Sequence, residues 1–236
     1  MTQMGAIIAG GIIAAGEGSR LRAGGWTGSK PLLPIAGRPL IAHSLDRLRA
    51  AGIRRIAMII NEESPDCRQW LERDGNAIGL DLMVRSTPSS YASFQIVASR
   101  LAGEAAVITT VDSVMAPADF RHFLDEVARM PKGAVVLGLT THVEDEKPLW
   151  ASLDQASGRI LALGQPNSGL VTAGIYVLPA HRPAEPAGGF GRLRDYLGWL
   201  VASGHPVHGV VMGRVFDVDR PQDVAAAELA LRSNEA

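Results

Sequence analysis

The sequence predicts an α/β fold with a doubly wound, mostly parallel sheet. Short apolar runs alternate along the chain with segments whose apolar residues recur at helical spacing, and the run at 107–111 stops abruptly at a polar residue. Apolar strands separated by helices are typical of a parallel sheet that helices cover on both faces. No repeat, low-complexity stretch or long linker interrupts the 236 residues, so we expect one domain, 1–236.

The first half of the chain shows this alternation most regularly. Residues 6–15 are expected to form a buried strand that leads into a glycine-rich loop. Pro39 is expected to open a helix with apolar residues on one face, and Gly52 to end it. Strands are further expected at 55–60, 80–84, 105–111 and 134–139, and helices at 66–73, 90–101 and 117–130.

The second half is less regular. Strands are expected at 151–154, 159–163, 171–178 and 207–218, and helices at about 192–202 and 221–232. We expect the later strands to form a smaller lid beside the main sheet.

Composition and charge exclude several classes of function. The net charge is -1, with 47% hydrophobic and 20% charged residues, so no overall field draws the chain to nucleic acid or to an acidic membrane. The apolar run at 6–15 is shorter than the about 20 residues of a transmembrane helix, and no basic segment precedes it as in a signal peptide. The single cysteine, Cys67, excludes an internal disulfide and fits a reducing compartment. We expect a cytoplasmic protein.

A glycine-rich segment at 16–20 follows the first strand and indicates phosphate binding. Its glycines let backbone N–H groups approach phosphate oxygens, and Arg20 and Lys30 add positive charge in a chain where lysine is rare. Neither the dinucleotide fingerprint nor the Walker A motif fits, because Leu21 replaces the third glycine and no Gly-Lys-Ser/Thr occurs. The alternative is an ordinary glycine turn with a solvated Arg20.

Residues 11–21 and 30–40 together resemble the N-terminal motif of the sugar-1-phosphate nucleotidyltransferase superfamily. They read Gly-Ile-Ile-Ala-Ala-Gly-Glu-Gly-Ser-Arg-Leu and Lys-Pro-Leu-Leu-Pro-Ile-Ala-Gly-Arg-Pro-Leu. The resemblance implies a Rossmann-like (GT-A-like) fold, with an NTP-binding half at about 1–130 and an acceptor-binding half, including the lid, at about 131–236. It implies that Lys30 lies at the reacting phosphates. It further implies that the nucleotide binds along Ala14, Ala15, Gly16, Gly18, Ser19 and Arg20.

The spacing within this motif bears on the subfamily. Lys30 follows Arg20 by ten positions, as in sugar-phosphate and phosphocholine members of the superfamily. The gap is shorter in molybdenum-cofactor guanylyltransferases and methylerythritol-phosphate cytidylyltransferases. The chain departs from the motif at Ser29, where proline is usual, and at 23–26, where Ala-Gly-Gly-Trp replaces Pro-x-Thr. These departures bear on the choice of nucleotide and sugar.

Asp112 is a candidate metal ligand because it directly follows the apolar run at 107–111. Ligands of α/β sheets bind beyond the carboxyl ends of the strands. A carboxylate at such a place suits Mg²⁺, which prefers oxygen ligands. The alternative is a turn or helix-capping aspartate.

Asp217 and Asp219 are the second group of candidate ligands. Alternation sends both to one face of an extended segment, where two like charges are unfavourable unless a cation or donors separate them. The pattern Asp-x-Asp-x-Pro-x-Asp resembles the C-terminal element of the superfamily, which implies that one of them completes the metal site. We favour Asp219, then Asp217, and expect Asp223 on the surface of the last helix. The alternative is a capping role before the helix that Pro221 opens.

Four further residues are candidates with ordinary alternatives. Ser90 and Gln95 match the segment that contacts base and ribose in the superfamily, although an N-cap is nearly as good an interpretation. Lys147 is a candidate for the acceptor phosphate, with a solvated lysine as the alternative. Gly174 lies in a segment resembling the strand that faces the sugar, where glycine lets the acceptor approach the backbone; the alternative is a packed strand.

These expectations describe a magnesium-dependent nucleotidyltransferase. An acceptor phosphate oxygen attacks the α-phosphorus of an NTP and displaces pyrophosphate, with Arg20, Lys30 and Asp112 as catalytic residues and Mg²⁺ as cofactor. No general base is needed, because the acceptor phosphate is already ionised near neutral pH. The expected partners are an NTP and a small phosphorylated acceptor, most simply a sugar-1-phosphate. A monomer or small homo-oligomer is expected.

Three alternatives stay open. An alditol phosphate, phosphocholine or molybdopterin-type acceptor would keep the same chemistry. A glycosyltransferase would use Asp217-Val-Asp219 as its metal motif but would have no use for Arg20 and Lys30. A non-catalytic nucleotide-binding regulator predicts NTP binding without pyrophosphate release.

Overall fold

The computed structural model describes residues 3–73, 79–143, 146–166 and 168–232. The elements of the first half are β1 (Ala9–Ala14), α1 (Ser19–Ala23), a 3-10 helix η1 (Lys30–Leu32), β2 (Pro34–Ile35), β3 (Arg38–Pro39), α2 (Leu40–Ala50), β4 (Arg55–Ile60), α3 (Pro65–Arg73), β5 (Leu80–Val84), α4 (Ser90–Arg100), β6 (Ala106–Thr110), β7 (Ser113–Met115) and α5 (Pro117–Arg129). The second half holds β8 (Val135–Thr140), β9 (Ala151–Leu153), β10 (Ile160–Leu163), β11 (Val171–Leu178), α6 (Leu193–Ala202), β12 (Val207–Val211), β13 (Val215–Asp217) and α7 (Asp223–Arg232).

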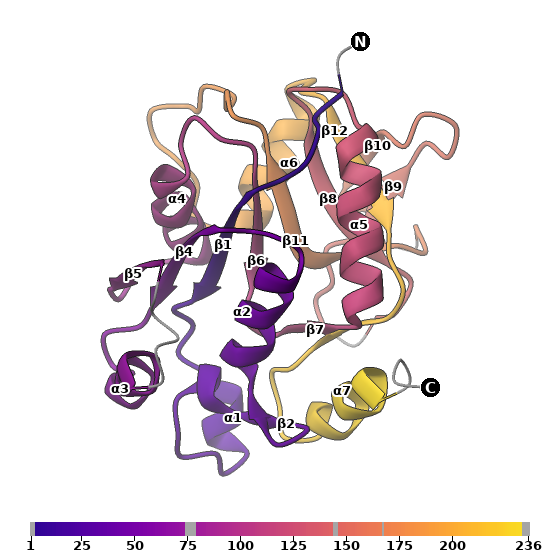
Figure 1. The fold of residues 1–236 in the computed structure, drawn as a ribbon. Coiled ribbons are helices and arrows are strands. Elements are labelled where there is room, and N and C mark those ends of the chain that lie inside the picture. The colour runs from indigo at the N-terminus through magenta and orange to yellow at the C-terminus, as the bar shows by residue number, and fades with distance from the viewer. Residues whose placement is uncertain (1–2, 74–78, 144–145, 167, 233–236) are drawn as a thin grey trace.

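Seven of the described strands form one sheet in the order β12-β8-β11-β6-β1-β4-β5 (Figure 1). Neighbouring strands are parallel except at β11, which runs antiparallel to both β6 and β8. The ladder of β1 with β4 runs from Ala9 opposite Arg55 to Ala14 opposite Ile60. The carboxyl ends of β1, β4 and β6 therefore meet at one edge of the sheet, where α/β folds bind ligands.

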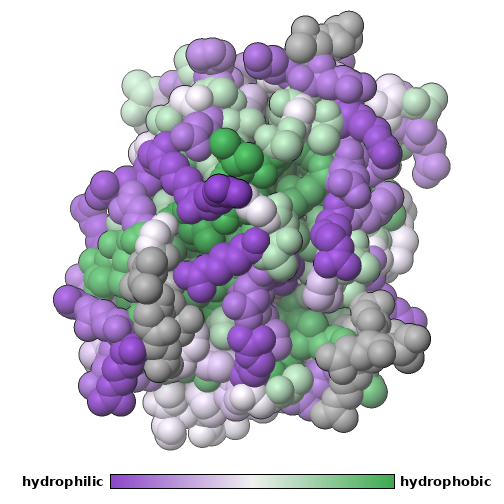
Figure 2. Space-filling view, in the orientation of Figure 1, coloured by the Kyte–Doolittle hydropathy of each residue, from purple (hydrophilic) through white to green (hydrophobic). Residues whose placement is uncertain are grey.

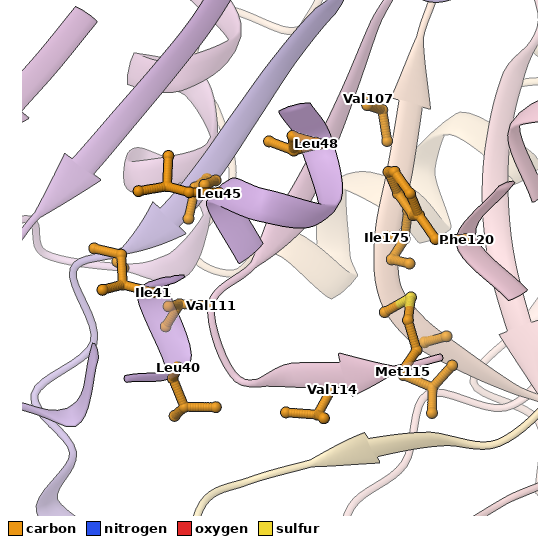
Figure 3. Close-up of a cluster of buried hydrophobic side chains, with 14 of the residues drawn as sticks. Leu40, Ile41, Leu45, Leu48, Val107, Val111, Val114, Met115, Phe120 and Ile175 are labelled. Carbon is orange, nitrogen blue, oxygen red and sulfur yellow. The ribbon is translucent and has the colours of Figure 1, made fainter. Parts of the chain in front are cut away.

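Helices cover both faces of this sheet, and each face has its own buried cluster. One cluster joins apolar residues of α2, α5 and α7 to β1, β4 and β6, and the other joins those of α4 and α6 to the opposite face. In Figure 3, Leu45 and Leu48 of α2 lie in the first cluster with Val114 and Met115 of β7 and Phe120 of α5. On the face shown in Figure 2, hydrophilic residues surround smaller hydrophobic areas. None of the helices in the described ranges has the length and apolar character that crossing a membrane requires.

The bounds of α2 show how the sequence determines an element. Pro39 precedes the first helical residue, and the apolar residues at helical spacing are buried. After the helix the chain turns at Gly52, whose φ of 78 lies in the left-handed region that glycine favours. The N–H of Ile53 then donates to the carbonyl of Leu48, which satisfies a carbonyl of the last turn.

The predicted fold class is confirmed, and most element bounds are close to those expected. β4, β5 and β11 have the expected bounds, and α2, α4, α5 and α6 differ by about one residue at an end. Of the later strands, β8, β11 and β12 belong to the main sheet, and the pair β9–β10 forms a separate two-stranded sheet. Of the strands expected to form the lid, only β9, β10 and β13 therefore lie outside the main sheet.

The single strand expected at 207–218 is wrong. β12 ends at Val211 and β13 begins at Val215, because the chain leaves the sheet at Gly213 to pair with β7. A Cβ at Gly213 would lie 2.5 Å from Oδ2 of Asp119 in α5, so the turn passes close to that helix. The short strand β7 was not expected, and its pairing with β13 positions the site described next.

Candidate active site

The predicted nucleotide-binding segment 14–20 connects β1 to α1 at the carboxyl edge of the sheet. Its first two residues are buried, and the others are partly or fully exposed. Gly18 precedes α1 with a left-handed φ of 64, and a Cβ there would lie 2.9 Å from Cβ of Lys30. Both the backbone conformation and the close approach of Lys30 therefore require glycine at this position.

Lys30 begins η1 and lies between two carboxylates. Its side chain is 7% exposed, and Nζ donates to Oδ2 of Asp112 at 2.6 Å and to Oδ1 of Asp219. Nη1 of Arg20 donates to Oδ2 of Asp219 at 2.6 Å. The two cations predicted to bind phosphate and two of the predicted metal ligands thus form one connected group.

These ion pairs shift the pKa of Lys30 and Asp112. Burial alone would lower the pKa of Lys30, but the charges and hydrogen bonds of Asp112 and Asp219 outweigh it and raise that pKa above its usual value. Burial alone would raise the pKa of Asp112, but the charge and hydrogen bond of Lys30 lower it instead. Near neutral pH, Lys30 is therefore a cation and Asp112 an anion.

The three predicted metal ligands meet because β7 pairs with β13. Asp112 follows β6 by two residues, and β7 begins directly after it. In the antiparallel pair Asp217 lies opposite Ser113, and the N–H of Val218 donates to the carbonyl of Asp112 at 3.1 Å. This pairing brings Asp217 and Asp219 beside Asp112, although they are far apart in the sequence.

Asp223 holds the loop that carries Asp219. Its carboxylate accepts hydrogen bonds from the N–H of Asp219 at 3.0 Å and from the N–H of Arg220 at 2.7 Å. The sequence predicts only a position on the surface of the last helix. The structure shows that the partly buried carboxylate also orients the backbone of a candidate metal ligand.

The donor set suits a divalent cation. One oxygen from each of Asp112, Asp217 and Asp219 lies within 4.8 Å of the others. Asp217 and Asp219, which were alternative candidates in the sequence, therefore both belong to the group. Their three negative charges face two positive charges, those of Lys30 and Arg20, so the group keeps a net negative charge. Carboxylate oxygens are the ligands that hard divalent ions prefer.

A cleft of about 260 Å³ opens beside this acidic group. Asp112 and Asp217 line it, with Arg194 and several apolar residues. Lys147, predicted on the acceptor side, is exposed and lies outside the lining; its carbonyl accepts a hydrogen bond from Nη2 of Arg194 at 2.8 Å. Six of the lining residues carry a hydroxyl group: Ser90, Thr110, Ser113, Thr140, Thr172 and Tyr176.

Gly174 lines the same cleft, and its neighbours explain why it is glycine. Its φ is 68, and a Cβ would lie 2.1 Å from Oγ of Ser113 and 2.7 Å from Oγ1 of Thr110. Gly174→Ala is expected to lower the free energy of unfolding by about 1–3 kcal/mol, because it adds a clash and backbone strain. Urea denaturation measures the change. In the control Gly198→Ala, within α6, a Cβ has no atom within 4 Å, and stability should rise slightly; equal losses in both variants would contradict this account.

The two residues predicted from the start of α4 take different places. Ser90 lines the cleft, and its Oγ accepts a hydrogen bond from the N–H of Leu193 at 3.2 Å. Nε2 of Gln95 donates to the hydroxyl of Tyr91 at 3.0 Å and to the carboxylate of Glu185. Gln95 thus joins α4 to the segment before α6 and lies outside the lining of the cleft.

Asn61 is a buried polar residue of this edge that the sequence analysis missed. It follows β4, and its Nδ2 donates to the carbonyl of Ala15 at 3.0 Å. Its Oδ1 accepts from the hydroxyl of Ser86 at 2.9 Å and from the N–H of Glu63 at 2.9 Å. It therefore connects the segments after β1, β4 and β5. The sequence does contain a signal for Asn61, because this polar residue directly follows an apolar run. The same pattern identified Asp112.

Comparison with known proteins places this chain in a family. Residues 10–207 match the family described as the MobA-like NTP transferase domain. A glucose-1-phosphate thymidylyltransferase of Actinoplanes sp. is 33% identical over 176 residues, which cover 72% of this chain and 57% of that protein. A mannose-1-phosphate guanylyltransferase of Mycobacterium tuberculosis is 28% identical over 173 residues, covering 70% of this chain and 47% of that protein. The chain thus spans about half the length of these curated relatives.

A solved structure agrees with the fold. The inositol-1-phosphate CTP transferase from T. maritima has a TM-score of 0.77 to this chain, with 98% of both chains covered at 19% identity. The segment that matches the family contains the glycine-rich loop, Lys30 and Asp112. The chain therefore belongs to the nucleotidyltransferases, in the family of MobA-like NTP transferase domains.

Proposed function

We propose that this protein transfers a nucleoside monophosphate from an NTP to a small phosphorylated acceptor, a sugar-1-phosphate or a similar polyol phosphate, and releases pyrophosphate. One observation carries the proposal: the buried ammonium of Lys30 and the carboxylates of Asp112, Asp217 and Asp219 converge between the glycine-rich loop and a cleft. A triphosphate and a second substrate would meet at such a point.

The residues of the chain would mainly bind and orient. Backbone N–H groups at 16–18 and the guanidinium of Arg20 hold the β- and γ-phosphates, while Lys30 faces the α-phosphate, where negative charge increases in the transition state. An acceptor phosphate oxygen attacks the α-phosphorus as the bond to the bridging oxygen of pyrophosphate breaks. Pyrophosphate leaves with that electron pair. No proton has to be removed, because the attacking oxygen is already ionised.

Asp112 and Asp219, with Asp217 beside them, would hold Mg²⁺. When bound, the ion would neutralise phosphate charge and help to orient the two substrates. The three carboxylates support this assignment because their oxygens lie close together and their charge exceeds that of Lys30 and Arg20.

The nucleotide would be bound mainly by residues of about 1–130 and the acceptor by residues of about 131–236, within one domain. The cleft supports this division, because Thr140, Thr172 and Arg194 line it from the second half. Lining residues that carry hydroxyl groups, together with Arg194, suit a polyhydroxylated phosphate ester, and the names of the two relatives specify sugar-1-phosphates. Ser90 lines the same cleft from the first half and supports a nucleotide contact.

Pyrophosphate release tests the proposal. The assay combines Mg²⁺, each of the four NTPs and a panel of sugar-1-phosphates, inositol phosphate, alditol phosphates and phosphocholine. We expect release that requires both an NTP and one class of acceptor. Tight NTP binding without release for any acceptor would favour a nucleotide-binding regulator and contradict the proposal.

A further inference from the structure

Arg47 is a buried charge that the proposed mechanism leaves unused. It lies in α2 and is 7% exposed. Burial lowers its pKa to about 10, so it is still a cation near neutral pH. Its hydrogen-bond partners within the described ranges are a carbonyl and a hydroxyl, and its Nε has no partner there. Burying a cation without a carboxylate partner costs free energy, so the presence of Arg47 at this position needs a physical explanation.

The hydrogen bonds of Arg47 fall on both sides of Asp112. Nη1 donates to the carbonyl of Ser113 at 3.2 Å, and Nη2 donates to Oγ1 of Thr109 at 3.4 Å. Cζ lies 5.4 Å from the centroid of the Phe120 ring, which packs in the cluster of Figure 3. One rigid guanidinium fork therefore connects the end of β6 to the start of β7.

Two further contacts hold the same stretch of backbone. The hydroxyl of Ser44, also in α2, lies 3.5 Å from the carbonyl of Val111, and the N–H of Val218 donates to the carbonyl of Asp112 at 3.1 Å. The carbonyls of three successive residues, 111 to 113, thus each have a donor. Helix α2 supplies the donors to the carbonyls of residues 111 and 113, and the segment after β13 supplies the donor to the carbonyl of Asp112.

We propose that Arg47 is a positioning residue, whose guanidinium holds the backbone at 109–113 so that the Asp112 carboxylate faces Lys30 and the divalent cation in one orientation. The effect of Arg47 on turnover rests on the proposed function, whereas its effect on cation binding does not depend on that function. It assigns a role to α2 that differs from substrate binding, because Arg47 itself does not line the cleft and reaches it only through the carbonyl of Ser113.

A packing role and a positioning role predict different results for Arg47→Met. Methionine keeps most of the length and removes the charge, and replacing a buried ionic side chain with an apolar one is often neutral for stability. If Arg47 only fills space, a folded Arg47→Met variant should bind the cation as tightly as wild type. If Arg47 positions Asp112, the carbonyl of Ser113 loses its donor and the turn shifts, and a shift of about 1 Å can lower a rate about 100-fold.

The test compares wild type, Arg47→Met, Arg47→Lys and the control Arg49→Met, which alters an exposed arginine of the same helix. Mn²⁺ binding is followed by electron paramagnetic resonance of the free ion, stability by thermal unfolding, and turnover by pyrophosphate release. For Arg47→Met we expect Mn²⁺ binding about tenfold weaker and kcat about 10- to 100-fold lower, with a smaller change in KM for the NTP and little change in Tm. Arg49→Met should behave as wild type.

Wild-type Mn²⁺ affinity in folded Arg47→Met would overturn the inference, and so would equal losses in Arg47→Met and Arg49→Met. If Arg47→Met does not fold, Arg47→Lys decides: one ammonium on a flexible stem cannot reproduce the planar fork, so binding should weaken several-fold, and unchanged affinity would overturn the inference. Absence of turnover by the wild type with every substrate pair would count against the proposed function alone, because the Mn²⁺ comparison still decides on Arg47.

Discussion

Lys30→Ala is expected to lower kcat for nucleotidyl transfer by about 10²–10³-fold, the range seen when one preorganised donor to developing charge is removed. The ammonium is largely shielded from water, so its interaction with a charged phosphate is screened less than on the surface. The aliphatic part of the Lys30 side chain lies beside the glycine-rich loop, since a Cβ at Gly18 would lie 2.9 Å from Cβ of Lys30. The large effect should therefore be on kcat.

Steady-state pyrophosphate release measures this effect, and circular dichroism checks that the variant is folded. The matched control is Lys132→Ala, because Lys132 is an exposed lysine between α5 and β8. Its kcat should equal that of wild type. A Lys30→Ala variant that is folded and retains more than about a tenth of wild-type kcat would contradict the role assigned to Lys30.

Asp112→Asn is expected to lower kcat by about 10³-fold and to raise the Mg²⁺ concentration needed for half-maximal rate. The change keeps the shape of the side chain but removes one of the three negative charges that face Lys30 and Arg20. The remaining carboxylates, Asp217 and Asp219, would bind a divalent ion more weakly, and Lys30 would keep only Asp219 as its partner.

Titration of Mg²⁺ at saturating substrates measures both quantities for Asp112→Asn. Asp125→Asn, on the exposed face of α5, is the control and should leave both unchanged. If Asp112→Asn lowered the rate without changing the Mg²⁺ requirement, Asp112 would be a structural partner of Lys30 and the assignment as a metal ligand would be wrong.

Elements with a continuous apolar run or clear helical periodicity were predictable from the sequence. Residues 56–60 are buried in β4, which lies between β1 and β5, and the chain turns after α2 at Gly52, which adopts a left-handed φ. The break between β12 and β13 was not predictable in the same way. Residues 207–218 read as one extended apolar segment, and the break depends on pairing with β7 and on the approach to Asp119.

The residues of the site likewise divide into those that the sequence predicts and those that it does not. The glycine-rich loop, Lys30 and the aspartates at 112, 217 and 219 stand in or after recognisable local patterns, and the structure brings them together. Arg47 carries no such pattern, because its position on an amphipathic helix gives no indication that it points at the segment after β6. Its role depends on tertiary contacts with Thr109 and Ser113, which no local spacing predicts.

The proposed reaction is tested most directly by ³¹P nuclear magnetic resonance of the wild-type protein with Mg²⁺, the preferred NTP and its acceptor. The account predicts that the NTP and acceptor phosphate signals decrease together, while a diphosphate-linked product and pyrophosphate appear in equal amounts. With Lys30→Ala the same spectrum should change at least about 100-fold more slowly. A second sample contains a nucleotide-activated sugar in place of the NTP. Its consumption there without pyrophosphate, at a rate that Lys30→Ala leaves unchanged, would contradict the account and indicate a glycosyltransferase.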